Sequence, residues 1–216
     1  MRQVSITVLL VFIFFTKTML PAFCTVKGGI EYSIPVDYSK INEQEAELKA
    51  RKYYFNAEKL KDGIINEDMT NALMLYSVLQ RVNPENTEYP VKLGFLYDKI
   101  NRDKQAKGCY FKAIELDKVN PKPYFYLGEF YYKRELLRRA LKYYREAYKL
   151  GMNTNYDLLY KMGDIYEKFG DTRSALKYLQ EAQIQSTNPE LENKIKKIEA
   201  QDAINKEYYS NTRIRG

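Results

Sequence analysis

The sequence contains no histidine, and only two of its 216 residues are cysteine. A chain without histidine cannot form a Ser-His-Asp or Cys-His catalytic system, a histidine general base or a histidine-ligated metal site. Two cysteines are too few for a disulfide framework, or for a four-cysteine zinc or iron–sulfur site within one chain. These absences remove most catalytic and metal chemistry, so we expect neither an enzyme nor a bound metal or cofactor.

Tryptophan is absent as well, whereas the chain contains 21 tyrosines. Lysine and arginine number 35 and aspartate and glutamate 28, which gives a formal net charge of +7. With 45% hydrophobic and 29% charged residues, the composition is that of a globular protein and not of a disordered or fibrous one. The basic excess is too modest to indicate a nucleic-acid partner.

The N-terminus carries a short hydrophobic segment. Residues 4–15 form an apolar run that only two hydroxyl residues interrupt, between the positive charges of Arg2 and Lys17. A helix that spans a bilayer needs about 20 apolar residues, so a run of this length is more typical of a secretory signal peptide. We therefore predict that residues 1–24 are a signal peptide.

The end of this segment leaves three outcomes open. Ala22 and Cys24 form a small-x-small cleavage site, which favours cleavage after Cys24. A lipid anchor on Cys24 is the second outcome, although Phe23 stands where such signals have a small residue, and an uncleaved membrane anchor is the third. Each outcome places the rest of the chain outside the cytoplasm, periplasmic or secreted. The absence of any Asn-x-Ser/Thr acceptor site favours a bacterial envelope.

Three stretches of the sequence repeat. Residues 91–97, 125–131 and 160–166 align without gaps, and the glycines at their centres are 34 and 35 residues apart. An alanine, a large residue and a second alanine follow each glycine at fixed distances. The repeated positions are Gly94, Gly128 and Gly163, then Ala106, Ala140 and Ala175, then Tyr110, Tyr144 and Leu179, and last Ala113, Ala147 and Ala182.

This pattern resembles the tetratricopeptide repeat family, whose signature places Leu-Gly, Tyr, Ala, an aromatic residue and Ala at these spacings. The resemblance covers residues 87–188 and implies an all-α fold, an α-solenoid of tandem helix-turn-helix units. The glycine and the alanines lie where the two helices of a unit cross closely, since a larger side chain would force them apart. We assign units at residues 87–120, 121–154 and 155–188.

Less regular segments flank the three units. A degenerate helical repeat is predicted at residues 42–86, and residues 189–208 are predicted to form a C-terminal capping helix with an apolar stripe at i, i+4 and i+7. Between the second and third units, Gly151 is predicted to end a helix as its C-cap. The remaining assignments are a tether at residues 25–41 and a tail at residues 209–216.

Six tyrosines fall on packing positions of the repeats, which explains much of the tyrosine excess. A tyrosine at the edge of a core can keep its hydroxyl in water. The single thiol left after signal cleavage, Cys109, adjoins one of them, and we interpret it as a small inert core residue. The six are Tyr76, Tyr97, Tyr110, Tyr131, Tyr144 and Tyr166.

The resemblance also implies a concave groove, lined by the first helix of each unit, which binds peptides in many members of the family. Its positions here offer aromatic rings with carboxylates beside them, and not the Lys, Asn and Arg of the clamp that holds acidic chaperone tails. Such a surface suits an apolar peptide with a basic residue, since buried aromatic rings dominate interface energies and acids steer association. The alternative is that these side chains solvate the groove or pack against the capping helix. The predicted groove residues are Phe95, Asp98, Phe125, Glu129, Tyr132, Tyr160, Asp164 and Glu167.

A second candidate surface, the basic outer face, lies on the second helices of the units. Four of its cations follow one another at i, i+4, i+7 and i+11, in a single helical stripe. Because like charges at i, i+4 oppose the helix, helix stability does not explain this stripe. It either contacts an anionic surface, at about 1 kcal/mol per residue, or is a solvated face. The residues are Lys104, Arg138, Lys142, Arg145, Lys149, Arg173 and Lys177.

Together these patterns predict a non-enzymatic, extracytoplasmic scaffold or adaptor of the cell envelope that binds another protein or peptide in its concave groove. The alternative is a surface-associated structural protein that docks on anionic membrane or envelope polymer through the basic outer face. Asp164 and Glu167 share a helix face, as a catalytic pair would, but acids beside lysines on solvated helices are ordinary ion pairs.

Overall fold

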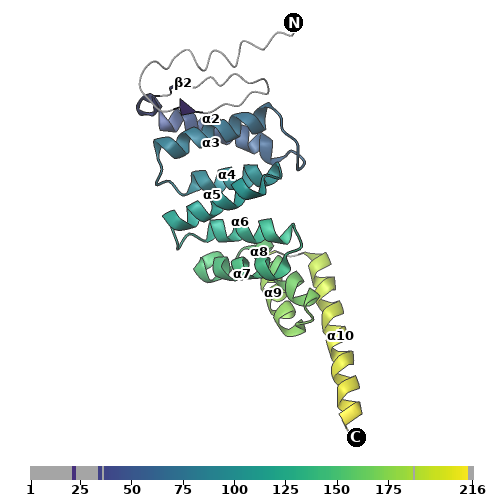
Figure 1. The fold of residues 1–216 in the computed structure, drawn as a ribbon. Helices are drawn as coiled ribbons and strands as arrows, with labels where there is room; N and C mark the ends of the chain where they lie inside the picture. The colour runs from purple at the N-terminus through teal and green to yellow at the C-terminus, as the bar shows by residue number, and fades with distance from the viewer. Residues whose placement is uncertain (1–20, 23–33, 36, 187, 214–216) are drawn as a thin grey trace. The chain divides into compact units, whose positions relative to one another are not determined.

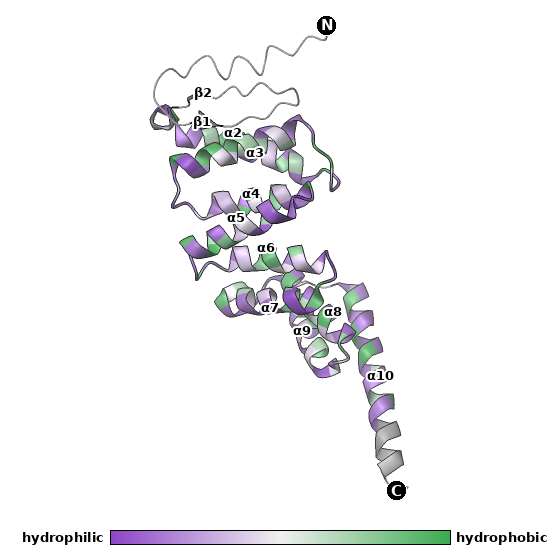
Figure 2. Ribbon diagram, viewed as in Figure 1, coloured by the Kyte–Doolittle hydropathy of each residue, from purple (hydrophilic) through white to green (hydrophobic). Residues whose placement is uncertain are grey.

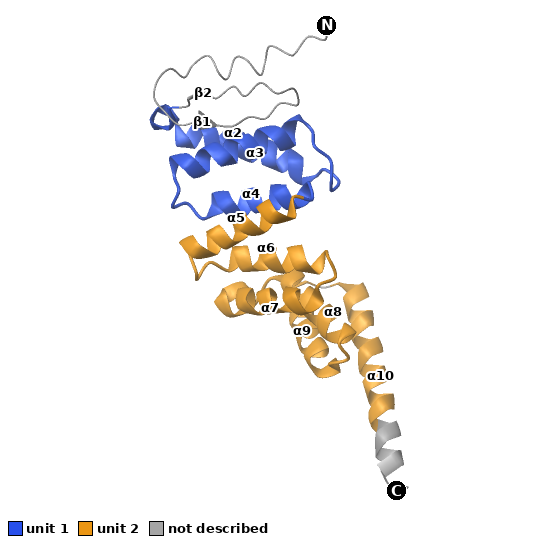
Figure 3. Ribbon diagram, viewed as in Figure 1, with its two compact units in different colours: residues 1–101 blue, residues 102–216 orange. Residues whose placement is uncertain are grey.

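The computed structural model describes residues 21–22, 34–35, 37–186 and 188–213, and most of them are helical (Figure 1). The predicted signal-peptide core and the cleavage site at Cys24 lie outside the described residues. The chain divides into two compact units, unit 1 over residues 1–101 and unit 2 over residues 102–216 (Figure 3).

Helices follow one another along both units. In unit 1 they are η1 (Tyr38–Lys40), α2 (Glu43–Glu58), α3 (Glu67–Val82) and α4 (Glu88–Lys99). In unit 2 they are α5 (Asp103–Leu116), α6 (Pro121–Tyr132), α7 (Leu137–Ala147), the π-turn η2 (Tyr148–Met152), α8 (Tyr156–Lys168), α9 (Thr172–Gln185) and α10 (Pro189–Arg213). The only strands in the described ranges are β1 (Pro21–Ala22) and β2 (Ile34–Pro35), two-residue segments that pair antiparallel. The predicted all-α fold is confirmed.

Unit 1 contains the degenerate repeat. Helix α2 packs on α3, and α3 packs on α4. Asparagine side chains start the first two helices: Asn42 accepts from the Glu45 amide at 3.2 Å and Asn66 from the Met69 amide at 2.9 Å. Such N-caps satisfy amide groups that the first helical turn leaves without a partner. Helices α2 and α3 both fall within residues 42–86, where the degenerate repeat was predicted.

The segment just before α2 packs on unit 1. The carboxylate of Asp37 is almost fully buried and accepts from the Ser39 amide at 3.1 Å, which starts the short helix η1. The hydroxyl of Tyr38 accepts from Arg81 of α3 at 2.8 Å. Residues 37–41, which we assigned to the tether, are therefore attached to the first repeat.

Unit 2 shows why the repeats need glycine. Helices α6 and α7 pack as one pair and α8 and α9 as the next, as the resemblance implies. A Cβ on Gly128 would lie 3.0 Å from Cγ of Tyr144 and closer still to two other atoms of that ring. A Cβ on Gly163 would lie 2.6 Å from Cγ of Leu179. Helix crossings this close leave room only for a hydrogen on the α-carbon.

The joint between the second and third units has the predicted geometry. Helix α7 gives way to the π-turn η2, inside which Gly151 has φ +105°. An L-residue with a side chain rarely adopts this left-handed conformation, whereas glycine does so without strain. Asn155 then caps the next helix by accepting from the Leu158 amide at 2.9 Å.

The tyrosines fill the repeat interior more completely than we expected. Tyr76, Tyr110 and Tyr144 are all at most 2% exposed, and Tyr131 is also buried. The hydroxyl of Tyr144 is not in water, as we had expected for an edge residue, because it donates to Glu129 at 2.5 Å. Burial of the ring is thus combined with a polar partner inside the protein.

Helix α10 closes the array. Its stripe packs on α9, with Leu191 and Ile195 buried and Ile198 half-buried. Helices of both units carry hydrophilic as well as hydrophobic residues along their length (Figure 2). Helix α10 continues to Arg213, so the tail that we predicted from residue 209 is largely helical.

No helix in the described part of the chain has both the length and the hydrophobicity to cross a bilayer.

Candidate functional site

The structure divides the predicted groove residues between the two units. Phe95 and Asp98 lie on α4 of unit 1 and are half-buried. The ring of Phe95 packs on that of Tyr54, with centroids 5.5 Å apart, and the ammonium of Lys92 lies 4.1 Å from the centroid of Tyr54. The other six predicted groove residues lie on α6 and α8 of unit 2.

These six residues come together through hydrogen bonds and ring contacts. The hydroxyl of Tyr132 on α6 donates to Asp164 on α8 at 2.8 Å. The buried hydroxyl of Tyr144 donates to Glu129 at 2.5 Å, and the ring of Phe125 lies 6.1 Å from that of Tyr144. The predicted aromatic and acidic residues therefore form one connected cluster in unit 2.

Lysines of the same unit neutralise the carboxylates of this cluster. Lys161 pairs with Glu129, and its ammonium lies 5.5 Å from the ring centroid of Tyr132. Lys168 pairs with Asp164 at 2.9 Å. Acids that are paired inside the protein attract a basic partner much less than free acids would.

A lysine from the capping helix completes the cluster. Lys194 of α10 lies 3.2 Å from Asp164 Oδ1 and 2.8 Å from Glu167 Oε2, with its ammonium 5.2 Å from the ring centroid of Tyr160. Two carboxylates and an aromatic face surround this ammonium, in the arrangement that we expected for a basic residue of a partner peptide. In this structure the chain's own capping helix supplies that basic residue.

The pKa shifts in the cluster follow from these contacts. Partial burial raises the pKa of Asp164, but hydrogen bonds from Lys168, Tyr132 and Lys194 outweigh burial and hold it below its usual value. Burial lowers the pKa of Lys194, and its bonds to Glu167 and Asp164 more than compensate, so the pKa is raised. Burial, together with an acidic acceptor, raises the pKa of Tyr132 and of Tyr144. The raised pKa values of Tyr132 and Tyr144 keep their hydroxyls protonated at neutral pH, as donors to the carboxylates of Asp164 and Glu129.

Helix α10 borders a cleft next to this cluster. The cleft has a volume of about 630 Å³ and lies between α10, the end of α8 and the start of α9. Only Glu167 among its lining residues belongs to the predicted groove. We missed the others because we assigned α10 a capping role only, although the carboxamides of this helix were visible in the sequence. The lining residues are Glu167, Thr172, Glu190, Asn193, Lys194, Lys197, Ile198, Gln201, Asp202 and Asn205.

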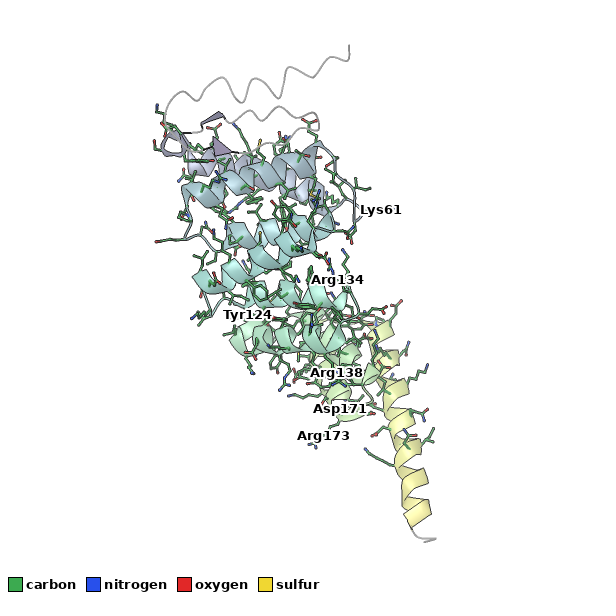
Figure 4. The ribbon with its side chains drawn as sticks, in the orientation of Figure 1. Lys61, Tyr124, Arg134, Arg138, Asp171 and Arg173 are labelled. Atoms are coloured by element: carbon green, nitrogen blue, oxygen red, sulfur yellow. The ribbon has the colours of Figure 1, made fainter. Side chains whose placement is uncertain are left out.

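The basic outer face is also visible in the structure. Arg138, Lys142, Arg145 and Lys149 line one shallow hollow of about 310 Å³ along α7 and η2, together with Leu141 and Glu146. Figure 4 labels Arg138 and Arg173, which come from α7 and α9. Arg173 and Lys177 are exposed on α9, and Lys104 is exposed on α5 but does not line the hollow.

Cys109 and the acids offer little for catalysis. Cys109 is half-buried on α5, and burial raises the pKa of its thiol to about 11, which keeps it in the less reactive thiol form. Asp164 and Glu167, the carboxylates that share a helix face, are joined through Lys194 as an ordinary ion-paired group. In the described ranges no three or more Cys, Asp or Glu residues gather as a metal site would require.

Residues 156–183 match the tetratricopeptide repeat family model. The match covers α8 and most of α9. A TPR repeat-containing protein of Methanocaldococcus jannaschii is 30% identical over 105 residues, a stretch that covers 49% of this chain but only 18% of that protein. The chain thus spans less than a fifth of the length of this relative.

Solved structures show the same fold. PilF of Pseudomonas aeruginosa superposes with a TM-score of 0.62 at 13% identity, over 76% of this chain and 72% of that one. A MamA protein superposes with a TM-score of 0.52 at 20% identity, over 66% of this chain and 72% of that one. These comparisons support the tetratricopeptide repeat family that the sequence suggested, and they confirm the α-solenoid fold.

Proposed function

We propose that the protein is a non-enzymatic scaffold or adaptor that binds a segment of another protein outside the cytoplasm. A tetratricopeptide fold indicates protein–protein interaction, and the comparisons support that fold. The observation that carries the proposal is the cleft of about 630 Å³ that α10 forms with the end of α8 and the start of α9.

The lining of the cleft indicates the chemistry of the partner. The carboxamide of Asn193 offers a donor and an acceptor, Gln201 donates to Asn205 Oδ1 at 3.1 Å, and charges of both signs lie beside them. Ile198 is half-buried at the same surface and adds one apolar contact. A polar segment with alternating charges fits this lining better than the apolar peptide that we expected for the inner groove, whose rings and acids are already engaged within unit 2.

Two features support a location outside the cytoplasm. The apolar run at residues 4–15 has the length of a signal-peptide core. Cleavage after Cys24 would leave Cys109 as the one remaining thiol, and its raised pKa makes it slow to oxidise. A protein with one inert thiol tolerates an oxidising compartment.

The proposal is tested by photo-crosslinking in the cells that make the protein. A photoreactive phenylalanine analogue replaces Asn193 in the cleft or, as the control, Ile184, which is 80% exposed on α9 and does not line the cleft. We expect a discrete adduct with one other protein from position 193 and none from position 184. Equal adducts at the two positions, or no adduct at position 193, would contradict binding in the cleft.

The location is tested separately by fractionating the same cells. We expect the full-length product to lose its first 24 residues and to appear outside the cytoplasm. Recovery of the intact chain in the cytoplasm would contradict the location without affecting the binding proposal.

A further inference from the structure

The outer surface of unit 2 combines positive charge with exposed apolar side chains. We call the surface formed by α7, η2, α9 and the loops that precede α7 and α9 the docking face. It includes six cations of the basic outer face, all of them exposed, and exposed Arg139. The six are Arg138, Lys142, Arg145, Lys149, Arg173 and Lys177.

The positive charge of the docking face exceeds its negative charge. Four carboxylates lie on the same elements and loops: Glu135, exposed in the loop before α7, and three that have a structural partner within the protein. Glu146 pairs with Lys149 at 2.8 Å, Glu181 accepts from the hydroxyl of Tyr148 at 3.1 Å, and Asp171 caps α9. With Lys133 and Arg134 of the loop before α7 included, nine cations against four carboxylates leave a net charge of +5 on this face.

Stacked tyrosines lie beneath these cations. The rings of Tyr131 and Tyr143 stack at 5.5 Å with an interplanar angle of 6°, and those of Tyr166 and Tyr178 stack at 5.5 Å and 8°. The ammonium of Lys177 lies 5.0 Å from the centroid of Tyr178. A ring that attracts an ammonium restricts that side chain, so less conformational entropy is lost when the cation binds.

The tyrosines also connect the two helices of the face. Tyr148 of η2 meets the edge of Tyr178 on α9, with ring centroids 5.6 Å apart. Its hydroxyl donates to Glu181 of the same helix. The cations of α7 and of α9 therefore belong to one continuous surface of unit 2.

Two large apolar side chains project beside the cations. Leu136, in the loop before α7, is 44% exposed, and Phe169, in the loop before α9, is 45% exposed. The guanidinium of Arg138 lies 6.0 Å from the ring centroid of Phe169. A soluble polyanion would use the cations alone, whereas a lipid bilayer offers anionic headgroups for the cations and an acyl boundary for the leucine and phenylalanine side chains.

We infer that the docking face binds the surface of an anionic membrane, with Leu136 and Phe169 inserted at the headgroup level and the cations of α7 and α9 on lipid phosphates. The cleft along α10 adjoins this face at the start of α9, but none of the cations named above and neither Leu136 nor Phe169 lines it. An adaptor with both sites would hold its partner protein at a membrane.

The experiment is vesicle flotation with the full-length chain. Vesicles of phosphatidylglycerol and phosphatidylcholine are compared with vesicles of phosphatidylcholine alone. Binding to the neutral vesicles measures how far the N-terminal apolar run by itself attaches the protein to lipid. The test variant is Arg138→Gln with Arg145→Gln. The control is Lys196→Gln with Lys206→Gln, which removes the same charge from exposed positions of α10. Phe169→Ser tests the apolar contribution.

A cation near an anionic surface contributes about fivefold in binding, so loss of Arg138 and Arg145 should weaken partitioning on the order of 30-fold. The control should change it only slightly, and Phe169→Ser should remove most of the binding that persists at high salt. An equal loss of vesicle binding in both double variants would overturn the inference, because binding would then depend only on the net charge of the protein. Equal binding to soluble dextran sulfate with no effect of Phe169→Ser would also overturn it, in favour of an anionic polymer.

Crosslinking from position 193 should be unchanged in the Arg138→Gln, Arg145→Gln variant if that variant folds normally. Its thermal unfolding should match that of wild type, because both arginines are exposed. Loss of vesicle binding with a shifted unfolding transition would count against the inference, since misfolding would then explain the loss.

Discussion

Replacement of Gly128 by alanine is expected to destabilise unit 2. Gly128 lies where the ring of Tyr144 crosses α6, and an added Cβ would lie 3.0 Å from Cγ of that ring and closer to two other ring atoms. Carbon atoms attract best at about 3.5–4.0 Å, so the ring or the helix must move. The ring has little freedom to move, because Tyr144 is fully buried and its hydroxyl donates to Glu129 at 2.5 Å.

Two effects of opposite sign set the magnitude of this change. Alanine stabilises a helix relative to glycine by about 1 kcal/mol. Overpacking a close-packed interior costs about 1–3 kcal/mol, and the restrained ring places Gly128 at the upper end of that range. The net loss in unfolding free energy is therefore about 2 kcal/mol. For a chain of this size that loss lowers the Tm by about 4–8 °C.

The assay compares thermal unfolding, followed by far-UV circular dichroism, of wild type, Gly128→Ala and Gly108→Ala. Gly108 on α5 is the matched control, since an added Cβ there meets nothing within 4 Å. Gly108→Ala should stabilise the protein by up to about 1 kcal/mol. If the two variants were equally stable, the helices of the second unit would not cross as closely as described, and the packing argument for the repeat glycines would fail.

Two further predictions concern titratable groups. The folded-state pKa of Asp164 is depressed, so the stability it contributes is fully present above the unfolded-state pKa of about 3.9 and is lost as the pH falls through the lower folded-state value. Asp164→Asn should cost about 1–3 kcal/mol at pH 7 in urea unfolding and progressively less as the pH falls below the unfolded-state pKa, and an equal cost at pH 7 and at pH 2 would contradict the ion pairs. Cys109, with a pKa of about 11, should react with iodoacetamide at pH 8 roughly 100-fold more slowly in the folded protein than in urea, and equal rates would show an exposed thiol.

The sequence predicted the helices and their pairing well because these depend on local periodicity. Glycine and alanine recur where helices cross, and Gly128 and Gly163 meet Tyr144 and Leu179 at the spacing of the repeat. Gly151 was predicted as a C-cap from its place between two helical patterns, and its φ of +105° agrees. The repeat register also placed the buried tyrosines, since burial follows from the helix period.

The boundaries were less accurate than the elements. The capping helix extends past residue 208 to Arg213. At this end neither a proline nor a glycine marks the stop, so helix propensity and tertiary contacts decide the last turn.

Whether the groove acids are already paired within the protein depends on contacts between helices that are distant in the sequence. The sequence showed acids and aromatic rings at groove positions, but not that Lys161 pairs with Glu129 or that Lys194 of the capping helix pairs with Asp164 and Glu167. Lys194 follows Lys161 by 33 residues, close to the repeat length, and this spacing was the available signal.

Sequence alone determined that this protein is an α-solenoid of repeated helix pairs, because small residues at fixed spacing bring neighbouring helices together wherever they occur. Only the tertiary structure decided which surface stays open. An ion pair requires two side chains from different repeats to meet within a few ångströms, and that depends on how each helix pair is rotated against the next. The packing rotates α10 so that Lys194 meets the groove acids, and Lys194 and Glu167 also line the cleft that runs along that helix.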